Sequence, residues 1–207
     1  MTDSAAAFLK LVSGRQGHFQ LESGHHGELW LDLDALFAEP RRVGPLVAQL
    51  SGALRAHAVE GVCGPLIGGA FLAQAIAAAL DVEFAFTERV VPEVSGRLYP
   101  VAYRLPPAFA PRVRGLRIAI VDDVMSAGSA ARGTYAELQA HGARPAVVGA
   151  LLVLGSTGED FFARQGVAVE AVARRPYRLW PPGECPLCES GVPLEAVSVS
   201  SSTTAAG

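Results

Sequence analysis

Two adjacent carboxylates at the end of an apolar run are the residues of this sequence best placed to do chemistry. Asp122 and Asp123 follow residues 118–121, Ile-Ala-Ile-Val, which have the pattern of a parallel strand buried on both faces. In open α/β sheets, ligands bind at the C-terminal ends of the strands, where such a pair can hold hydroxyl groups or a hydrated cation. The sequence therefore predicts a ligand site at this strand end.

A segment of small residues follows the pair and opens a helix. Ser126, Ala127, Gly128 and Ser129 lack bulky side chains, so several backbone N–H groups can converge on an anion at the positive end of that helix. Hydroxyl acceptors beside a phosphate cradle match a ribose 5-phosphate better than a nucleoside triphosphate, and the sequence contains no Gly-Lys-Ser/Thr. The structural alternative is an ordinary strand-to-helix turn with an aspartate cap.

The whole segment, VDDVMSAGSA, resembles the phosphoribosyl diphosphate (PRPP) motif of type I phosphoribosyltransferases. The resemblance implies that Asp122 and Asp123 contact the ribose 2- and 3-hydroxyls, act in catalysis and support Mg²⁺, directly or through water. It also implies that the 5-phosphate is bound by Val124, Met125, Ser126, Ala127, Gly128, Ser129 and Ala130.

Three further segments are similar to the orotate phosphoribosyltransferase branch of that family. Residues 17–40 resemble its N-terminal hood, residues 62–77 its diphosphate loop and helix, and residues 175–194 its C-terminal segment. The similarity covers nearly the whole chain up to about Leu194. It implies an α/β fold with a parallel sheet flanked by helices and a small hood. It further implies a homodimer that transfers the phosphoribosyl group of PRPP to orotate.

A second glycine-containing loop lies one βα unit before the PRPP motif. Glycines let the backbone approach an anion at a helix N-terminus, although Gly-Pro and Gly-Gly also mark plain turns. Family members often carry a lysine in this loop, at the position of Ile67 or Gly68. The resemblance implies that the diphosphate is bound by Gly64, Pro65, Leu66, Ile67, Gly68 and Gly69. Arg97 of the later lid segment is a further candidate for diphosphate binding, or else a solvated loop residue.

Positive charge over the site must come from arginine, because Lys10 is the one lysine among the 17 lysines and arginines. Residues 88–99 have the composition of a flexible lid, with Arg89 and Arg97 flanking a Pro/Ser/Gly stretch. We expect Arg89 to be the catalytic cation. The lid lacks the lysines and histidines of orotate enzymes, so a PRPP-binding regulatory relative without turnover is an alternative to the enzyme.

The base pocket is where the resemblance fits least. Glu22 stands where the orotate branch has a lysine, and a carboxylate there would repel the carboxylate of orotate. Trp30 and Leu31 match the pair that frames the base, and Trp30 either stacks on the base or packs on the core. His25 and His26 replace basic residues of the family, but paired histidines on a polar turn are expected to face solvent. A purine or xanthine acceptor is therefore also open.

Cys185 and Cys188 form half of a metal knuckle, because thiolates separated by two residues can hold one Zn²⁺. Cys63 lies on a predicted buried strand and no histidine follows His141, so a four-ligand site within the chain would need unusual geometry. Structural zinc, a disulfide and free thiols are all open.

Composition agrees with a one-domain cytoplasmic enzyme. A chain of 207 residues, 50% of them hydrophobic, can bury a full core, and a formal charge of −3 gives no reason to expect a nucleic-acid partner. Residues 62–80 carry no charge, but Gly64-Pro65 and Gln74 interrupt the run, which argues against a membrane span. The first ten residues lack the pattern of a signal peptide.

The predicted elements alternate in a doubly wound order. One domain is expected over residues 1–195, with a hood mainly at 14–38 and a disordered tail at 196–207. Helices are expected over residues 5–12, 41–57, 69–80, 129–141 and 159–164, strands over 61–63, 83–87, 117–121, 146–154 and 167–172, and a hairpin from 18–22 and 29–33.

Overall fold

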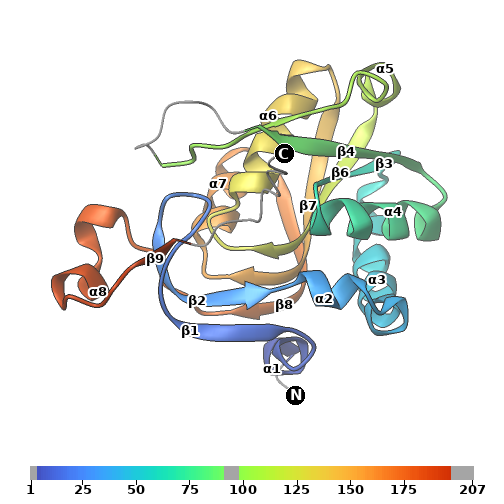
Figure 1. Cartoon of the computed structure of the whole chain (residues 1–207). Coiled ribbons are helices and arrows are strands. Elements are labelled where there is room, and N and C mark those ends of the chain that lie inside the picture. The colour runs from blue at the N-terminus through green and yellow to red at the C-terminus, as the bar shows by residue number, and fades with distance from the viewer. Residues whose placement is uncertain (1–3, 91–97, 197–207) are drawn as a thin grey trace, which may run out of the picture.

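A six-stranded, mostly parallel sheet forms the centre of the molecule, and a three-stranded sheet lies beside it (Figure 1). The computed structural model describes residues 4–90 and 98–196. The elements follow in the order α1 (Ser4–Leu9), β1 (Ser13–Gln20), β2 (His26–Asp32), α2 (Asp34–Phe37), α3 (Pro40–Leu54), η1 (Arg55–His57), β3 (Gly61–Pro65), α4 (Gly68–Leu80), β4 (Glu83–Val90), β5 (Ala102–Arg104), α5 (Ala110–Val113), β6 (Arg117–Met125), α6 (Ser129–Ala140), β7 (Arg144–Leu154), α7 (Thr157–Arg164), β8 (Ala168–Arg175), η2 (Pro182–Glu184), α8 (Pro186–Glu189) and β9 (Glu195–Ala196).

The strand order of the main sheet is β5-β4-β3-β6-β7-β8. Strands β4, β3, β6, β7 and β8 pair in parallel, and β5 pairs antiparallel to β4 at the edge. Parallel neighbours need crossover connections, which α4, α6 and α7 supply along the chain. The predicted α/β fold with a parallel sheet and flanking helices is therefore confirmed, with one antiparallel edge strand.

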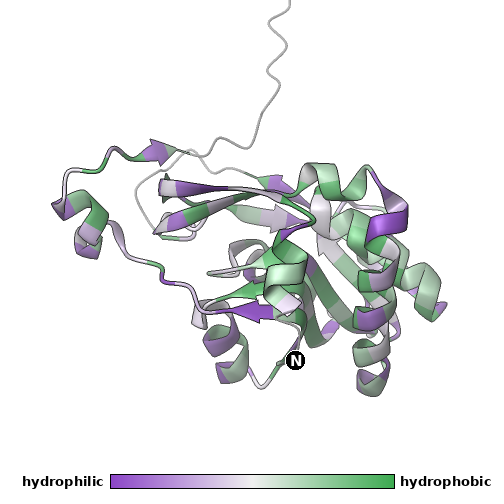
Figure 2. Ribbon diagram, turned by 90° about the horizontal axis from the view of Figure 1, so that it is seen from below, coloured by the Kyte–Doolittle hydropathy of each residue, from purple (hydrophilic) through white to green (hydrophobic). Residues whose placement is uncertain are grey.

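Two apolar cores lie on the two faces of the main sheet, because its central strands are apolar on both sides. Along β6, Ile118 and Ile120 face the core formed with α6 and α7, whereas Ala119 and Val121 face the core formed with α3 and α4. All four side chains are at most 1% exposed. Figure 2 shows these apolar strands enclosed between helices. Burial on both faces fixes the position of β6 along its neighbouring strands, and with it the position of the carboxylates near its C-terminal end.

The hood is a hairpin of β1 and β2, which pair antiparallel, with the short β9 added in parallel to β1. Alternation along β2 turns Leu29 and Leu31 toward the main core, while His26, Glu28 and Trp30 share the opposite face. The hairpin predicted from the sequence is therefore present, with longer strands than predicted. Segments from both ends of the chain meet in this small sheet (Figure 1).

The structure corrects several predicted boundaries. Strand β6 does not end at residue 121 but continues to Met125, because Val124 and Met125 still pair with β7. The first helix ends at Leu9 rather than at residue 12, and α2, β5, α5 and α8 have no counterpart among the predicted elements. The centre of the lid and the predicted tail from residue 197 onward lie outside the described residues. No helix within residues 4–90 and 98–196 has the length and hydropathy needed to span a membrane.

Candidate functional site

Asp122 and Asp123 lie near the C-terminal end of β6, at the edge of the sheet where the sequence predicts a ligand site. Asp122 is buried, with 8% of its surface exposed, and Asp123 is partly exposed. The Asp123 backbone N–H donates to Oδ1 of Asp122 at 3.1 Å, and the Val124 N–H donates to Oδ1 of Asp123 at 2.7 Å. These bonds hold both carboxylates in fixed orientations next to each other.

Burial and the neighbouring charge of Asp123 raise the pKa of Asp122 well above its ordinary value. The negative charge of Glu22 acts in the same direction, so this hood residue lies close enough to the pair to affect it. The buried carboxylate of Asp122 and the partly exposed carboxylate of Asp123 therefore repel each other unless a cation or a proton offsets their charge.

We expect Asp122→Asn to stabilise the ligand-free protein at pH values above the raised pKa of Asp122. The ionised wild-type carboxylate costs stability there, whereas asparagine keeps the Oδ1 acceptor without the charge. The expected gain in Tm at pH 8 is about 2–4 °C, the shift that ~1 kcal/mol produces in a domain of this size. As pH falls through the folded pKa, the wild type becomes protonated and the difference should vanish. Thermal melts from pH 8 to pH 4 measure this, and a gain that grows toward low pH would contradict it.

The loop between β3 and α4 packs directly against the carboxylate pair. A Cβ placed on Gly68 would overlap the Oδ2 atom of Asp123, and one placed on Gly69 would lie 3.0 Å from Oδ1 of Asp122. Only glycine allows this approach of backbone to carboxylate. The two loops that the sequence assigned to the two phosphate ends of PRPP therefore meet at the Asp122–Asp123 pair.

The same loop presents backbone donors at a helix N-terminus. Within the described residues, the N–H groups of Ile67, Gly68 and Gly69 have no backbone acceptor, while Ala70 N–H donates to the Ile67 carbonyl at 3.2 Å. Ile67 stands at a position where family members often carry a lysine. Its side chain is 56% exposed, so this position is open to solvent. Open amides supply the partial positive charge that an anion needs here.

The predicted 5-phosphate loop turns from β6 into α6 through Gly128, whose φ of 74° favours glycine. The first backbone bond of the helix runs from the Arg132 N–H to the Gly128 carbonyl at 2.8 Å, and no side chain of the described residues caps the helix. The Gly158 N–H donates to the Ser126 carbonyl at 3.0 Å and so fixes the start of the turn. The loop thus leaves the N-terminal amides of α6 open to an anion.

Glu22 and Arg89, for which the sequence predicted separate roles, form one ion pair. Arg89 Nε donates to Oε2 of Glu22 at 3.1 Å, and the Tyr103 hydroxyl donates to both oxygens of Glu22 at 3.0 and 3.1 Å. Burial, followed by the charges of Glu22 and Asp122, raises the pKa of Tyr103. The negative charge of Glu22 is therefore offset by Arg89, and the tyrosine stays protonated as a donor.

Arg132 is a further candidate for the site that the sequence reasoning missed. Its guanidinium carbon lies 3.6 Å from the ring centre of Tyr99 and 4.0 Å from that of Phe161. No carboxylate of the described residues forms an ion pair with it. The sequence did offer one signal for this residue: Arg132 lies in the first turn of α6, directly after the predicted 5-phosphate loop.

The turn of the hood closes over Arg132. The pKa of His25 is lowered by burial and then by the charge of Arg132, and the His25 ring lies edge-on to Tyr99 with centres 5.6 Å apart. The Tyr99 N–H donates to the Ser23 carbonyl at 2.8 Å. The expectation that His25 and His26 face solvent is wrong, since they are 7% and 4% exposed. The His25 ring packs against Tyr99, whereas His26 lies against His18 and Cys188.

The other predicted base contacts lie on the hood strands. Leu31 packs against the main core, and the guanidinium carbon of Arg15 lies 5.0 Å from the Trp30 ring centre. Trp30 therefore has a cationic partner on the adjacent strand, and its contact with the base stays a prediction. Arg97 lies outside the described residues, so its role in diphosphate binding also stays a prediction.

Cys185 and Cys188 lie at the N-terminus of α8, beside the hood and away from the pair on β6 (Figure 1). Both are free thiols, as is the buried Cys63. Their neighbours are His18 and His26 of the hairpin. The sequence predicted that a four-ligand site within the chain would need unusual geometry. The two histidines come from the other end of the sequence, and the hairpin places them beside the cysteines.

Known phosphoribosyltransferases resemble this chain over most of its length. No family model matches the chain. It is 30% identical over 180 residues to an orotate phosphoribosyltransferase of Thermotoga petrophila, covering 87% of this chain and 89% of the relative. It is 31% identical over 189 residues to an orotate phosphoribosyltransferase of Carboxydothermus hydrogenoformans, covering 90% and 92%.

Solved structures share the fold. The orotate phosphoribosyltransferase of Aeropyrum pernix superimposes with a TM-score of 0.62 at 22% identity, covering 84% of this chain and 93% of that one. The adenine phosphoribosyl transferase of Trypanosoma brucei, in complex with AMP, pyrophosphate and ribose-5-phosphate, gives a TM-score of 0.64 at 16% identity, covering 83% and 79%. With a 30% identical relative matched over most of both lengths, this chain belongs to the type I phosphoribosyltransferase family, a family of pentosyltransferases.

Proposed function

We propose that this phosphoribosyltransferase transfers the 5-phosphoribosyl group of PRPP to orotate. The observation that carries the proposal is the packing of Gly68 and Gly69 on the carboxylates of Asp123 and Asp122. It joins a diphosphate loop, a hydroxyl-binding pair and a 5-phosphate loop into one continuous surface. This surface matches the three parts of PRPP in the order in which they are bonded.

Each part of the surface has a distinct task in the transfer. The open amides of α6 bind the 5-phosphate, Asp122 and Asp123 accept the ribose hydroxyl protons, and the loop of residues 64–69 faces the diphosphate. Bond breaking at C1 leaves positive charge on the ribose and negative charge on the departing diphosphate. The carboxylate pair favours the first charge and the amides favour the second.

Magnesium is the metal that we propose for this site, on the basis of the donor set. Asp122 and Asp123 offer adjacent hard oxygen donors, and burial together with the charge of Asp123 raises the pKa of Asp122, so a cation at the pair would be favoured. When bound, Mg²⁺ would neutralise diphosphate oxygens. The protein itself orients the ribose and holds the anion at the two helix ends.

Orotate as the acceptor is supported by the relatives and by the arginines of the site. An acidic base needs a cation, and Arg132 is held between Tyr99 and Phe161 without a carboxylate partner among the described residues. The charge of Glu22, which argues against an anionic base, is offset by Arg89. We therefore propose that Arg132 faces the carboxylate of the base and that Glu22 and Tyr103 line the same compartment.

A panel of acceptors tests the proposal. The protein is mixed with PRPP, Mg²⁺ and each of orotate, uracil, adenine, guanine, hypoxanthine and xanthine, and diphosphate release is followed. We expect release with orotate, and a KM for orotate raised about 10- to 100-fold in Arg132→Gln, as loss of a charge-assisted bond implies. Arg164→Gln, on the α7 surface, serves as the control and should leave KM unchanged.

Other outcomes of the panel select the alternatives. Diphosphate release with a purine or with xanthine, and not with orotate, would identify that base as the acceptor. Measurable PRPP binding without release from any base would support a regulatory relative that kept the phosphoribosyl site and lost turnover.

We also propose a homodimer. An apolar groove between α2, α3 and α4 supports it, because exposed apolar surface of this kind commonly marks a protein interface. Phe71 in this groove is 52% exposed. The mass of the protein in solution tests the assembly. The groove is lined by Phe37, Ala38, Pro40, Val43, Gly44, Val47, Phe71 and Ala75.

A further inference from the structure

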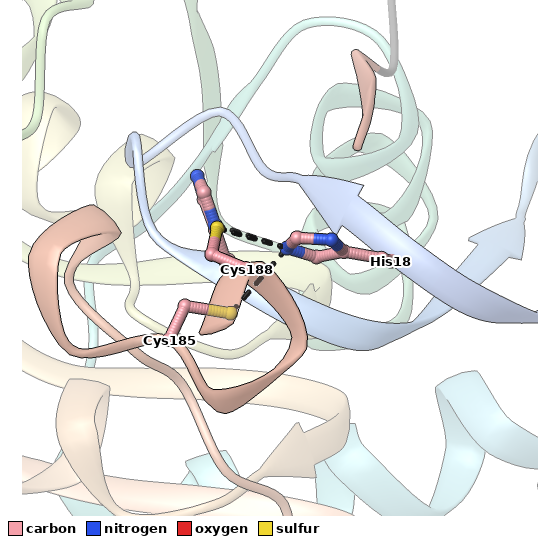
Figure 3. Close-up of side chains that lie close together, drawn as sticks. His18, Cys185 and Cys188 are labelled. Carbon is pink, nitrogen blue, oxygen red and sulfur yellow. Dashed lines mark hydrogen bonds between the residues drawn. The ribbon is translucent and has the colours of Figure 1, made fainter. Parts of the chain in front are cut away.

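Four metal-binding side chains from opposite ends of the chain converge beside the hood. His18 lies on β1, His26 begins β2, and Cys185 and Cys188 flank the first turn of α8. One ligand atom from each of the four lies within 4.8 Å of the others. Figure 3 shows the two thiols directed at the imidazole of His18. We propose that this cluster, the His18–Cys188 cluster, is a structural zinc site.

The spacing of the ligand atoms matches tetrahedral zinc. His18 Nε2 lies 3.0 Å from His26 Nδ1, 3.3 Å from the Cys185 sulfur and 3.7 Å from the Cys188 sulfur. The Cys188 sulfur lies 3.3 Å from His26 Nδ1. Zinc bonds of about 2.0–2.1 Å to nitrogen and about 2.3 Å to sulfur place tetrahedral ligands roughly 3.3–3.8 Å apart. Four of the six pairs of ligand atoms therefore lie within a few tenths of an ångström of tetrahedral spacing, and all six lie within 4.8 Å.

Hydrogen bonding alone accounts poorly for this convergence. His18 Nδ1 lies 2.8 Å from the Val192 carbonyl oxygen, which can only accept, so Nδ1 carries the proton and Nε2 presents its lone pair. Three other ligand atoms lie around that single lone pair. Fixing the tautomer of a ligating histidine through a backbone carbonyl is the usual outer support of a metal site.

The donor set selects zinc among common metals. Two thiolates and two imidazoles form the Cys₂His₂ set that suits Zn²⁺, whereas Mg²⁺ and Ca²⁺ prefer oxygen donors. Binding releases the two thiol protons and replaces them by one divalent ion, so the cluster stays neutral overall. All four positions are filled by protein, which is the arrangement of structural rather than catalytic sites.

The segment that carries the cysteines has little other means of holding its position. Cys185 is the only buried residue between 181 and 196. Among the described residues, the other links of this segment to the hood are the His18–Val192 carbonyl hydrogen bond, the backbone bonds between His26 and Trp180, the short β9 pairing and an exposed Arg15–Glu195 ion pair. Exposed ion pairs contribute little, and a segment without a core commonly depends on a metal. Figure 2 shows this arm standing apart from the apolar centre.

Zinc at this cluster also steadies the candidate base compartment. His18 and His26 stand on the two strands of the hairpin whose turn carries Glu22 and His25. An ion that joins both strands to α8 restrains that turn from outside the site. Its ligands are separate from the Asp122–Asp123 pair, so the zinc proposal does not depend on the identity of the acceptor base.

Metal analysis of the full chain tests the proposal. The protein is purified under reducing conditions without chelators and its metals are quantified by mass spectrometry. We expect one zinc per chain, and X-ray absorption should show two sulfur neighbours at about 2.3 Å and two nitrogen neighbours at about 2.0–2.1 Å. Cys188→Ser and His26→Gln should lose at least about nine-tenths of the zinc, given the 10- to 100-fold or larger losses that follow removal of even outer support.

The chain offers matched controls for both ligand types. Cys63→Ala removes a buried thiol on β3, and His25→Gln alters the residue next to His26, so both should keep one zinc per chain. If a ligand variant fails to fold, the wild type itself decides. Chelation should lower its Tm by about 5–10 °C, and Zn²⁺, but not Mg²⁺, should restore it.

Three results would overturn the proposal. The first is a wild type that holds less than a tenth of a zinc per chain after growth in zinc-supplemented medium and after anaerobic reconstitution. The second is full zinc retention in Cys188→Ser. The third is a Cys185–Cys188 disulfide in freshly purified protein, seen as a mass lower by two hydrogens.

Discussion

Asp123→Asn should reduce kcat/KM for PRPP by about 10²- to 10³-fold, the loss typical of removing one charged group that acts at the reacting centre. The carboxylate packs against Gly68 of the proposed diphosphate loop and lies beside Asp122, where we propose that it contacts the ribose hydroxyls. Asparagine keeps an acceptor for the Val124 N–H, and the fold should be retained. Steady-state kinetics, calorimetric titration with PRPP and thermal melts measure the three effects.

Asp81→Asn is the matched control for this variant. Asp81 ends α4 with φ of 56°, a conformation that asparagine also accepts, and it lies on the surface away from the pair. Kinetics and Tm should stay within error of the wild type. Unchanged PRPP affinity in Asp123→Asn would refute the placement of the ribose on the Asp122–Asp123 pair.

Gly64→Ala should cost about 2–4 kcal/mol of stability and at least about 100-fold in kcat/KM, as overpacking against fixed backbone implies. A Cβ at this position would overlap the carbonyl oxygen and carbon of Gly69 and lie 2.9 Å from the Ala70 nitrogen. All three are backbone atoms, so a side-chain rotation cannot relieve the contact. The loop of residues 64–69 must move away from the carboxylates, which separates the diphosphate amides from the ribose site.

Gly52→Ala separates this effect from a general cost of replacing glycine. Gly52 lies in α3, and a Cβ there meets nothing within 4 Å. Alanine should therefore stabilise the helix by about 0.5–1 kcal/mol and leave activity unchanged. Denaturant unfolding and PRPP kinetics compare the two variants. If Gly64→Ala matches the wild type in both, the tight packing between β3 and α4 does not position the diphosphate loop.

The sequence by itself determined the local parts of this protein. The apolar run before Asp122 specified a strand buried on both faces, and the small residues 126–129 specified a tight entry into α6. Both signals are local, since backbone conformation and burial pattern depend on neighbouring residues. The alternation of strands and helices then defined the fold class and the edge of the sheet at which we propose that PRPP binds.

Only the tertiary structure decided which distant residues act together. Glu22 in isolation predicts repulsion of an acidic base, but folding brings Arg89 to its carboxylate from 67 positions away. Arg132 gains its place between Tyr99 and Phe161 from three separate segments. Pairing over such separations leaves no local periodicity or spacing in the sequence.

The cysteine knuckle shows the same division. Cys185 and Cys188 specify half of a tetrahedral set through their spacing, which the sequence states directly. The other half is His18, 167 positions before Cys185, and His26, 162 positions before Cys188, and the pairing of β1, β2 and β9 brings them to the cysteines. Chemistry carried by adjacent residues was thus determined by the sequence, whereas chemistry shared between strands depended on the register and crossovers of the sheet, which only the folded chain fixes.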